Sequence, residues 1–247
     1  PAGNSDLSKV LIGAGGIYAA FLYYGTLQED VFSYQNADGE KFKSAWFLQM
    51  CEAMANVVVG GIGLSVAGGT KGLPLQMFAL SGSAQVCAKA FTSLALANGL
   101  SFPVVTLAKS GKMVPVMIGS LLLGGSKYTL RQYLSVAAII TGTALVSMGK
   151  KKASGSSSTL GLVFIAASLI CDGITGGMQN RLKAATIEKT GNKPKPYDLM
   201  FWTNVMMAGV ALAVALVLGE LNVGFDYCVK NPVILTKIVK FALCSAV

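Results

Sequence analysis

The sequence of 247 residues contains no histidine. Acid–base catalysis by imidazole, serine–histidine triads and His-ligated zinc or haem are therefore excluded. Its five cysteines are odd in number, have no metal-like spacing and lie mostly inside apolar runs, where a free cysteine behaves as a small hydrophobic residue. We therefore expect a protein that is not an enzyme and that needs neither a metal nor another cofactor.

Charged residues are also scarce. They make up 13% of the chain, about half the usual share of a soluble domain, whereas 53% of the residues are hydrophobic. The net charge of +9 is spread over short loops and helix interiors, without the basic stripe and interleaved aromatics of a nucleic-acid-binding protein. No Walker A or GxGxxG pattern supports an ATP-driven pump. This composition predicts an all-α, polytopic membrane protein.

Apolar stretches that are long enough to cross a bilayer recur along the chain. A further apolar segment begins at Asn231–Pro232 but is too short to complete an eighth span. Because of this, and because the chain starts at Pro1 without methionine, we expect further residues at both ends. The seven complete predicted spans are Leu7–Leu27, Trp46–Val66, Pro74–Leu96, Ser101–Gly124, Tyr133–Met148, Leu160–Asn180 and Leu199–Leu218.

The fourth predicted span carries Lys109 and Lys112 near its middle. Each costs about 2.5–3.5 kcal/mol at that depth, and three residues of separation place both ammonium groups on one face of a continuous helix. One interpretation is that each lysine is neutralised by a neighbouring helix. The other is a positively charged, water-filled cavity that receives a phosphate-bearing anion, with both lysines unneutralised.

Other polar residues lie inside predicted spans. Asp172 is near the centre of the sixth span and needs a partner or water, and Glu52 either pairs with a buried lysine or lies near the interface. Lys89 is a third intramembrane cation and shares a face with Gln85. The pair Tyr24 and Gln28 belongs either to an interfacial aromatic belt or to a cavity mouth.

Glycines predict close helix contacts at two places. Gly13, Gly15 and Gly16 lie in the first span, and Gly173 and Gly177 form a GxxxG spacing in the sixth.

A lysine run followed by a Gly/Ser-rich stretch at 150–158 predicts a linker between two halves, residues 1–149 and 159–247. With a cytosolic N-terminus, nine basic loop residues lie on the cytosolic side and six on the other. This agrees with the positive-inside rule, although the triple lysine at 150–152 weakens the assignment.

Five stretches together resemble the nucleotide-sugar transporters of the drug/metabolite transporter superfamily, in particular the endoplasmic-reticulum UDP-galactose transporter homologues. The most specific is the Lys-x-x-Lys-x-x-Pro-Val-Met block at 109–117. The others are Tyr23–Glu29, Ala88–Leu96, Ser168–Gly173 with Gly177–Gln179, and Ala242–Val247.

The resemblance implies ten helices in two inverted five-helix repeats, with the second repeat incomplete in this chain. It implies a secondary antiporter of an endoplasmic-reticulum, Golgi or other organelle membrane that exchanges a UDP-galactose-like or UDP-glucose-like nucleotide-sugar, or ATP and ADP, for a nucleotide. Lys109 and Lys112 would bind the diphosphate. Further residues implied to line the cavity are Tyr24, Gln28, Gln85, Lys89 and Gln179, while Glu52 and Asp172 are expected to have structural or gating roles.

Two alternatives remain open at this point. One is a non-transporting subunit of a larger membrane complex, kept for its packing surface; a homodimer or a membrane-complex partner is a separate expectation about assembly. The other is a plastid triose-phosphate carrier of the same superfamily.

Overall fold

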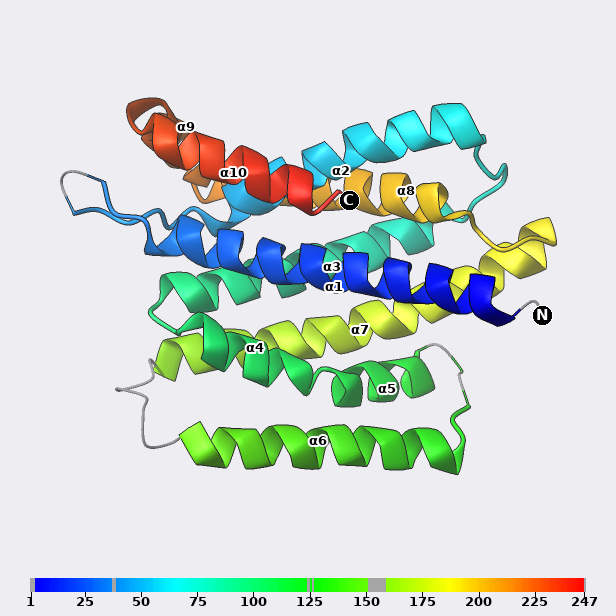
Figure 1. Ribbon diagram of the computed structural model, residues 1–247. Helices are drawn as coiled ribbons and strands as arrows, with labels where there is room; N and C mark the ends of the chain where they lie inside the picture. The colour runs from blue at the N-terminus through cyan, green and yellow to red at the C-terminus, as the bar shows by residue number, and fades with distance from the viewer. Residues whose placement is uncertain (1–2, 37–38, 124, 126, 151–158, 247) are drawn as a thin grey trace.

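The computed structural model describes residues 3–36, 39–123, 125, 127–150 and 159–246, which fold into a bundle of α-helices (Figure 1). Among these residues, the β-structure consists of an isolated bridge between Gln35 and Lys41, so the predicted all-α class is confirmed. The predicted linker at 150–158 lies, beyond Lys150, outside the described residues. The ten helices within the described ranges are α1 (Gly3–Ser33), α2 (Ala45–Ala67), α3 (Leu75–Ala97), α4 (Phe102–Ser110), α5 (Met113–Leu122), α6 (Leu130–Lys150), α7 (Thr159–Thr190), α8 (Pro196–Val217), α9 (Glu220–Lys230) and α10 (Pro232–Cys244).

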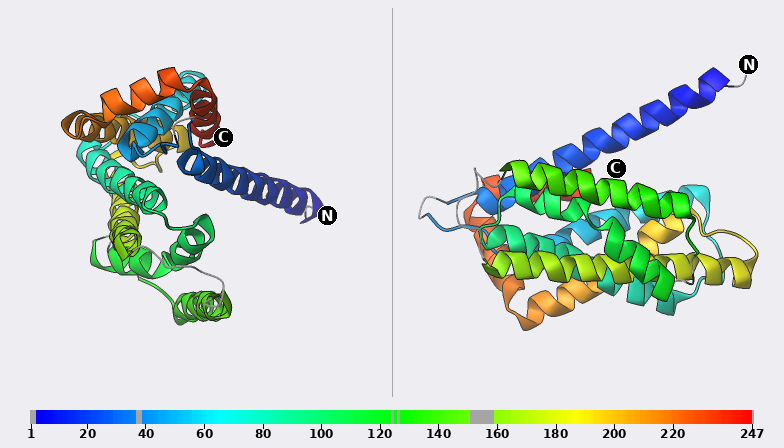
Figure 2. Two further views of the ribbon diagram at one scale, coloured as in Figure 1. Left: turned by 90° about the vertical axis from the view of Figure 1, so that its left-hand side faces the viewer. Right: turned by 90° about the horizontal axis from the view of Figure 1, so that it is seen from below.

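The long helices run alternately in opposite directions along the bundle (Figure 1). Helix α2 packs along α8, α3 packs along α7 and α8, α1 packs against α10, and α5 crosses α7. Buried apolar side chains fill these contacts; Phe42, Phe78, Leu182 and Phe241 are among the largest that are fully buried. The N-terminal half of α1 projects away from the other helices in both views of Figure 2.

Within the described residues, four helices are long and apolar enough to cross a membrane: α1 from Val10 onward, α2, α7 and α8. The bent pair of α4 and α5 makes a fifth if it is one span. Helices α3 and α6 correspond to the predicted third and fifth spans and have 23 and 21 residues, yet they are not among the described helices that qualify on composition. Many exposed side chains on the qualifying helices are large and apolar, as expected of a multi-pass membrane protein.

The predicted fourth span is not one continuous helix. It is broken between Ser110 and Met113 and bent by 41°. Pro115 explains the break, because its ring nitrogen cannot bond to the carbonyl of Gly111 and its ring crowds that carbonyl. Short turns take over here: the amide of Lys112 bonds to the carbonyl of Lys109 (3.1 Å), and that of Val114 to Gly111 (3.2 Å).

Glycine contacts distinguish the two predicted sites. A Cβ at Gly119 or Gly177 would overlap the backbone of the facing helix, and one at Gly173 would lie 2.5 Å from the carbonyl oxygen of Pro115. The GxxxG prediction is therefore confirmed as a backbone-to-backbone crossing of α5 and α7. The prediction for Gly13, Gly15 and Gly16 is wrong, since a Cβ at any of them would meet nothing within 4 Å.

Two further boundaries differ from the prediction. Helix α7 continues through residues 181–190, ten residues beyond Asn180, where the predicted sixth span ends. The short helix α9 was missed; it lies across one end of the bundle, where the Glu220 carboxylate accepts a hydrogen bond from the Trp46 amide (2.8 Å) and the Tyr227 hydroxyl donates to the Glu40 carbonyl (2.9 Å).

Candidate functional site

Lys109 forms an ion pair with Asp172. It lies in the last turn of α4, and its Nζ is 2.6 Å from Oδ2 of Asp172 in the middle of α7. Both side chains are partly accessible, at 22% and 21% of their surface. The prediction that both central lysines are unneutralised is therefore wrong for Lys109, because the fold brings a carboxylate 63 residues away in sequence into contact with it.

Lys112 has a different environment. It is exposed at the N-terminal end of α5, and among the described residues no carboxylate forms an ion pair with it. The helix break separates it from Lys109, so the two lysines do not share one face of a continuous helix. The positive end of the α5 dipole adds to its charge, and such broken-helix ends are where carriers bind anions.

Glu52, Lys89 and Tyr24 form a second polar cluster between α1, α2 and α3. Glu52 is 1% exposed; its Oε1 lies 2.5 Å from Nζ of Lys89, and both of its oxygens accept from the Tyr24 hydroxyl at 3.1 and 3.2 Å. Of the two alternatives left open for Glu52, pairing with a lysine is confirmed, although that lysine is 31% exposed and it is Glu52 that is buried. Tyr24 belongs to this cluster rather than to an interfacial belt.

One turn further along the same three helices, Gln28 and Gln49 both donate to the Ser93 hydroxyl, at 3.2 and 3.4 Å. All three side chains are buried, and Oε1 of Gln49 has no hydrogen-bond partner in the part of the chain that the structure describes. Gln28 therefore lies inside the bundle, in a polar layer that sequence reasoning did not identify because Gln49 and Ser93 lie on different helices.

A small cleft brings together two other predicted residues. The Gln179 amide donates to Oε1 of Gln85 at 3.4 Å, which links α7 to α3. The cleft beside this bond has a volume of about 220 Å³ and is also lined by Lys183 and the first turns of α8. Two lining residues, Thr203 and Asn204, were not predicted; polar side chains early in the apolar run of α8 were the available signal.

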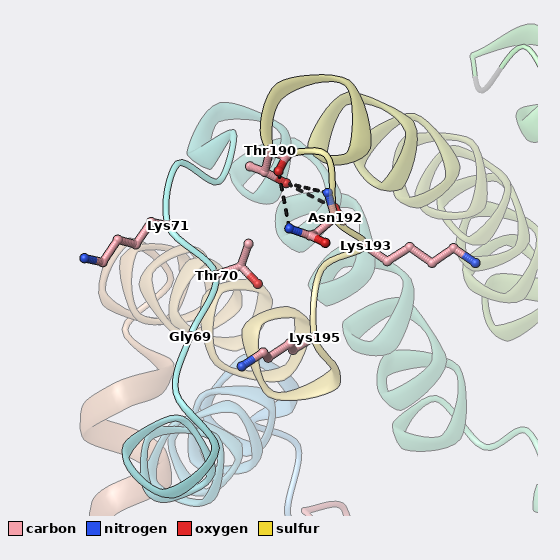
Figure 3. Close-up of a pocket in the computed structure, with 7 residues that line it drawn as sticks. All are labelled: Gly69, Thr70, Lys71, Thr190, Asn192, Lys193 and Lys195. Atoms are coloured by element: carbon pink, nitrogen blue, oxygen red, sulfur yellow. Dashed lines mark hydrogen bonds between the residues drawn. The ribbon is translucent and has the colours of Figure 1, made fainter.

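A larger open cleft of about 580 Å³ lies at one end of the bundle, between the α2–α3 and α7–α8 loops (Figure 3). Its side chains do not converge on one point, since Lys71 and Lys193 point away from each other. Lys195 donates to the carbonyls of Ala67 and Gly68, both at 2.9 Å, and so caps the end of α2. This cleft is a loop junction rather than a binding site for one anion.

Asp198 holds that junction together. It is 1% exposed, and its carboxylate accepts hydrogen bonds from the backbone amides of Thr70 (3.1 Å) and Lys195 (3.0 Å).

We expect Asp198→Ala to cost about 2 kcal/mol of folding stability, because these buried amides lose a charged acceptor. Hydrogen exchange should accelerate in residues 68–72 and 193–196. Glu188→Ala, which removes an exposed carboxylate nearby, should leave exchange unchanged; equal exchange in both variants would contradict this role.

The comparison with known proteins identifies the family. The model of the UAA transporter family matches residues 9–246. The chain belongs to the UAA transporter family. It is therefore a member of a transporter family and not an enzyme.

The curated relatives of this UAA-family chain carry several transporter names. It is 27% identical to UDP-galactose/UDP-glucose transporter 3 of Arabidopsis thaliana over 99% of this chain and 76% of that one. Identity to solute carrier family 35 member B1 of Gallus gallus is 28%, over 94% of this chain and 71% of that one. For adenosine 3'-phospho 5'-phosphosulfate transporter 2 of Aedes aegypti it is 25%, over 92% and 57%. The chain thus spans about three fifths to three quarters of the length of these relatives, and no solved structure matches it significantly.

Proposed function

We propose that this protein is a secondary transporter that exchanges a nucleotide-sugar or a nucleotide for another nucleotide across an organelle membrane, with the endoplasmic reticulum as the first candidate. The observation that carries the proposal is the break between α4 and α5, which presents the exposed Lys112, unpaired among the described residues, at a helix N-terminus three residues after Lys109. Relatives named as carriers of UDP-sugars and of a phosphosulfate nucleotide support a phosphate-bearing substrate.

The pairing of helices supports an architecture of two inverted repeats. Exchanging α1 with α7, α2 with α8 and α3 with α10 turns the α3–α7 contact into α10–α1 and the α3–α8 contact into α10–α2, and it maps α2–α8 onto itself. The members of each exchanged pair run in opposite directions (Figure 1). Such repeats place the substrate at their interface and alternate access by rocking.

The cleft at Gln85 and Gln179 is suited to the nucleobase. Amide side chains offer both donors and acceptors, as base edges require. At about 220 Å³ it is smaller than the roughly 300–1,000 Å³ of complete ligand pockets, so it suits one ring system rather than a whole nucleotide-sugar. Gln179 follows Asp172 by seven residues, two helical turns or about 10 Å along α7. Diphosphate and base would therefore lie along one helix.

The test is counterflow into proteoliposomes that are preloaded with UMP, ADP or ATP. Radiolabelled UDP-galactose, UDP-glucose, ATP and ADP are offered outside in turn. We expect accumulation of at least one of them above the level in protein-free liposomes, and only when a nucleotide is present inside. No accumulation of any of the four, by protein that remains monodisperse, would contradict the proposal.

Lys112→Gln should reduce that counterflow about tenfold or more, because one charge-assisted bond to phosphate is lost. Since Lys112 is exposed and unpaired, the melting temperature of the protein in detergent should stay the same. Lys230→Gln removes an exposed lysine of α9 and should leave transport unchanged. Full transport by Lys112→Gln would show that phosphate binds elsewhere.

A further inference from the structure

The Lys109–Asp172 pair connects the two halves of the chain. Lys109 belongs to α4, before residues 151–158, and Asp172 to α7, after them. Within the described residues, Lys109 is the only hydrogen-bond partner of the Asp172 carboxylate. The pair lies beside the place where α5 crosses α7 with backbone close to backbone at Gly119 and Gly173, and where the side chain of Val116 packs over Gly176. It is therefore a charged link between the two halves of the chain, next to a close crossing of two helices.

The second intramembrane ion pair provides an internal comparison. Lys89 is 31% exposed, but its partner Glu52 is 1% exposed and also accepts hydrogen bonds from Tyr24, so this carboxylate is held in place by two groups. Both members of the Lys109–Asp172 pair are about one-fifth exposed, and the carboxylate has a single partner. An anion that approaches from solvent can reach this pair and compete for the ammonium group.

From this geometry we infer that Asp172 is an internal counter-anion, which occupies the phosphate position on Lys109 when no substrate is bound and leaves it when a phosphate arrives. This inference rests on the proposed function. Two ammonium groups and one carboxylate leave the empty site with a single net positive charge. A diphosphate binds Lys109 and Lys112 together, whereas Asp172 binds one of them, so the substrate wins the competition.

The exchange of partners has a consequence for coupling. In the empty carrier the ion pair ties α4 to α7 and opposes their relative movement. In the loaded carrier the ion pair is open, so it no longer opposes the relative movement of α4 and α7. Only the loaded carrier then converts readily between the inward-open and outward-open states. Because the empty carrier does not return, transport requires a nucleotide on both sides of the membrane. Asp172 thus makes the protein an exchanger rather than a uniporter.

Asp172→Asn tests this role. With the competing carboxylate removed, the KM for the transported nucleotide should fall about tenfold if the pair is closed nine times in ten. Uptake into vesicles without internal nucleotide should rise relative to counterflow, because the empty carrier now returns. The control is Asp226→Asn, which opens the exposed Asp226–Lys230 pair of α9 and should change neither quantity.

Binding of pyrophosphate to purified protein separates this inference from the proposed function. We expect pyrophosphate to bind Asp172→Asn more tightly than the wild type and to raise its melting temperature more. If pyrophosphate binds Asp172→Asn more tightly but the wild type shows no counterflow, the counter-anion role of Asp172 is supported and the transport proposal is overturned. Normal wild-type counterflow with unchanged KM, unchanged empty-vesicle uptake and unchanged pyrophosphate affinity in Asp172→Asn would overturn the counter-anion alone. If Asp172→Asn does not fold without ligand, pyrophosphate should rescue it, and failure of this rescue also overturns the inference.

Discussion

A Gly119→Ala variant is expected to be recovered mainly as aggregate. The added Cβ would overlap the carbonyl of Gly173 on the facing helix, and neither backbone can move aside without separating α5 from α7. Overpacking in a core costs about 1–3 kcal/mol where side chains can adjust. Here the obstacle is backbone, so we expect a loss at or above the upper end of that range.

Size-exclusion chromatography of a fluorescent fusion in detergent measures this loss. Gly209→Ala is the matched control, because Gly209 lies within a spanning helix and its Cβ would meet nothing within 4 Å. The control should be neutral or slightly stabilising, since alanine is favoured over glycine in a helix by up to about 1 kcal/mol. A monodisperse Gly119→Ala protein with wild-type melting would show that α5 and α7 do not cross this closely.

Lys89→Met should be the second most damaging substitution. It leaves the Glu52 carboxylate, which is 1% exposed, with the Tyr24 hydroxyl but without a positive charge. Removing one partner of a fully buried pair typically costs about 3–5 kcal/mol, and because Lys89 is 31% exposed we expect the lower end of this range. Thermal unfolding in detergent should therefore shift strongly downward.

The double variant Lys89→Met/Glu52→Gln should recover most of this stability, because no uncompensated charge remains. Asp226→Asn, on an exposed pair that is 63–70% accessible, provides the scale for a surface pair and should change stability by less than about 1 kcal/mol. If Lys89→Met melts like the wild type, the Glu52 cluster does not contribute to stability in this way.

The helical class and most spans could be predicted from the sequence, because an uninterrupted apolar run of this length in a membrane satisfies its backbone hydrogen bonds by forming a helix. The break in the fourth span was also detectable: Pro115 follows Gly111 by four residues, the spacing at which proline removes a helical hydrogen bond. The break was not predicted because the apolar run from Ser101 to Gly124 is long enough for one continuous span. The glycines of α1 show the opposite error, since small residues permit a close contact but do not specify a partner.

Partners of the charged groups could not be predicted in the same way. Several lysines could pair with Glu52 or Asp172, depending on how the helices are arranged in the bundle. The periodicity of apolar residues does not determine how one helix is rotated against another. The pairs Glu52–Lys89 and Asp172–Lys109 follow only from the packing of α2 on α3 and of α4 on α7. The cleft at Gln85 depends likewise on the first turns of α8, which lie about 115 residues further along the chain.

The length of α7 also bears on the thickness of membrane that the protein can occupy. Its first 22 residues, to Asn180, carry one charge and rise about 33 Å, close to the roughly 30 Å of a hydrocarbon core. The last ten residues, which begin at Arg181, are helical but rich in charge, so they extend the rod into the headgroup layer. In a bilayer a few ångströms thinner or thicker, a modest change of tilt keeps Asp172 at the same depth. A carrier built on this helix can therefore span bilayers of somewhat different thickness with Asp172 still inside the hydrocarbon core.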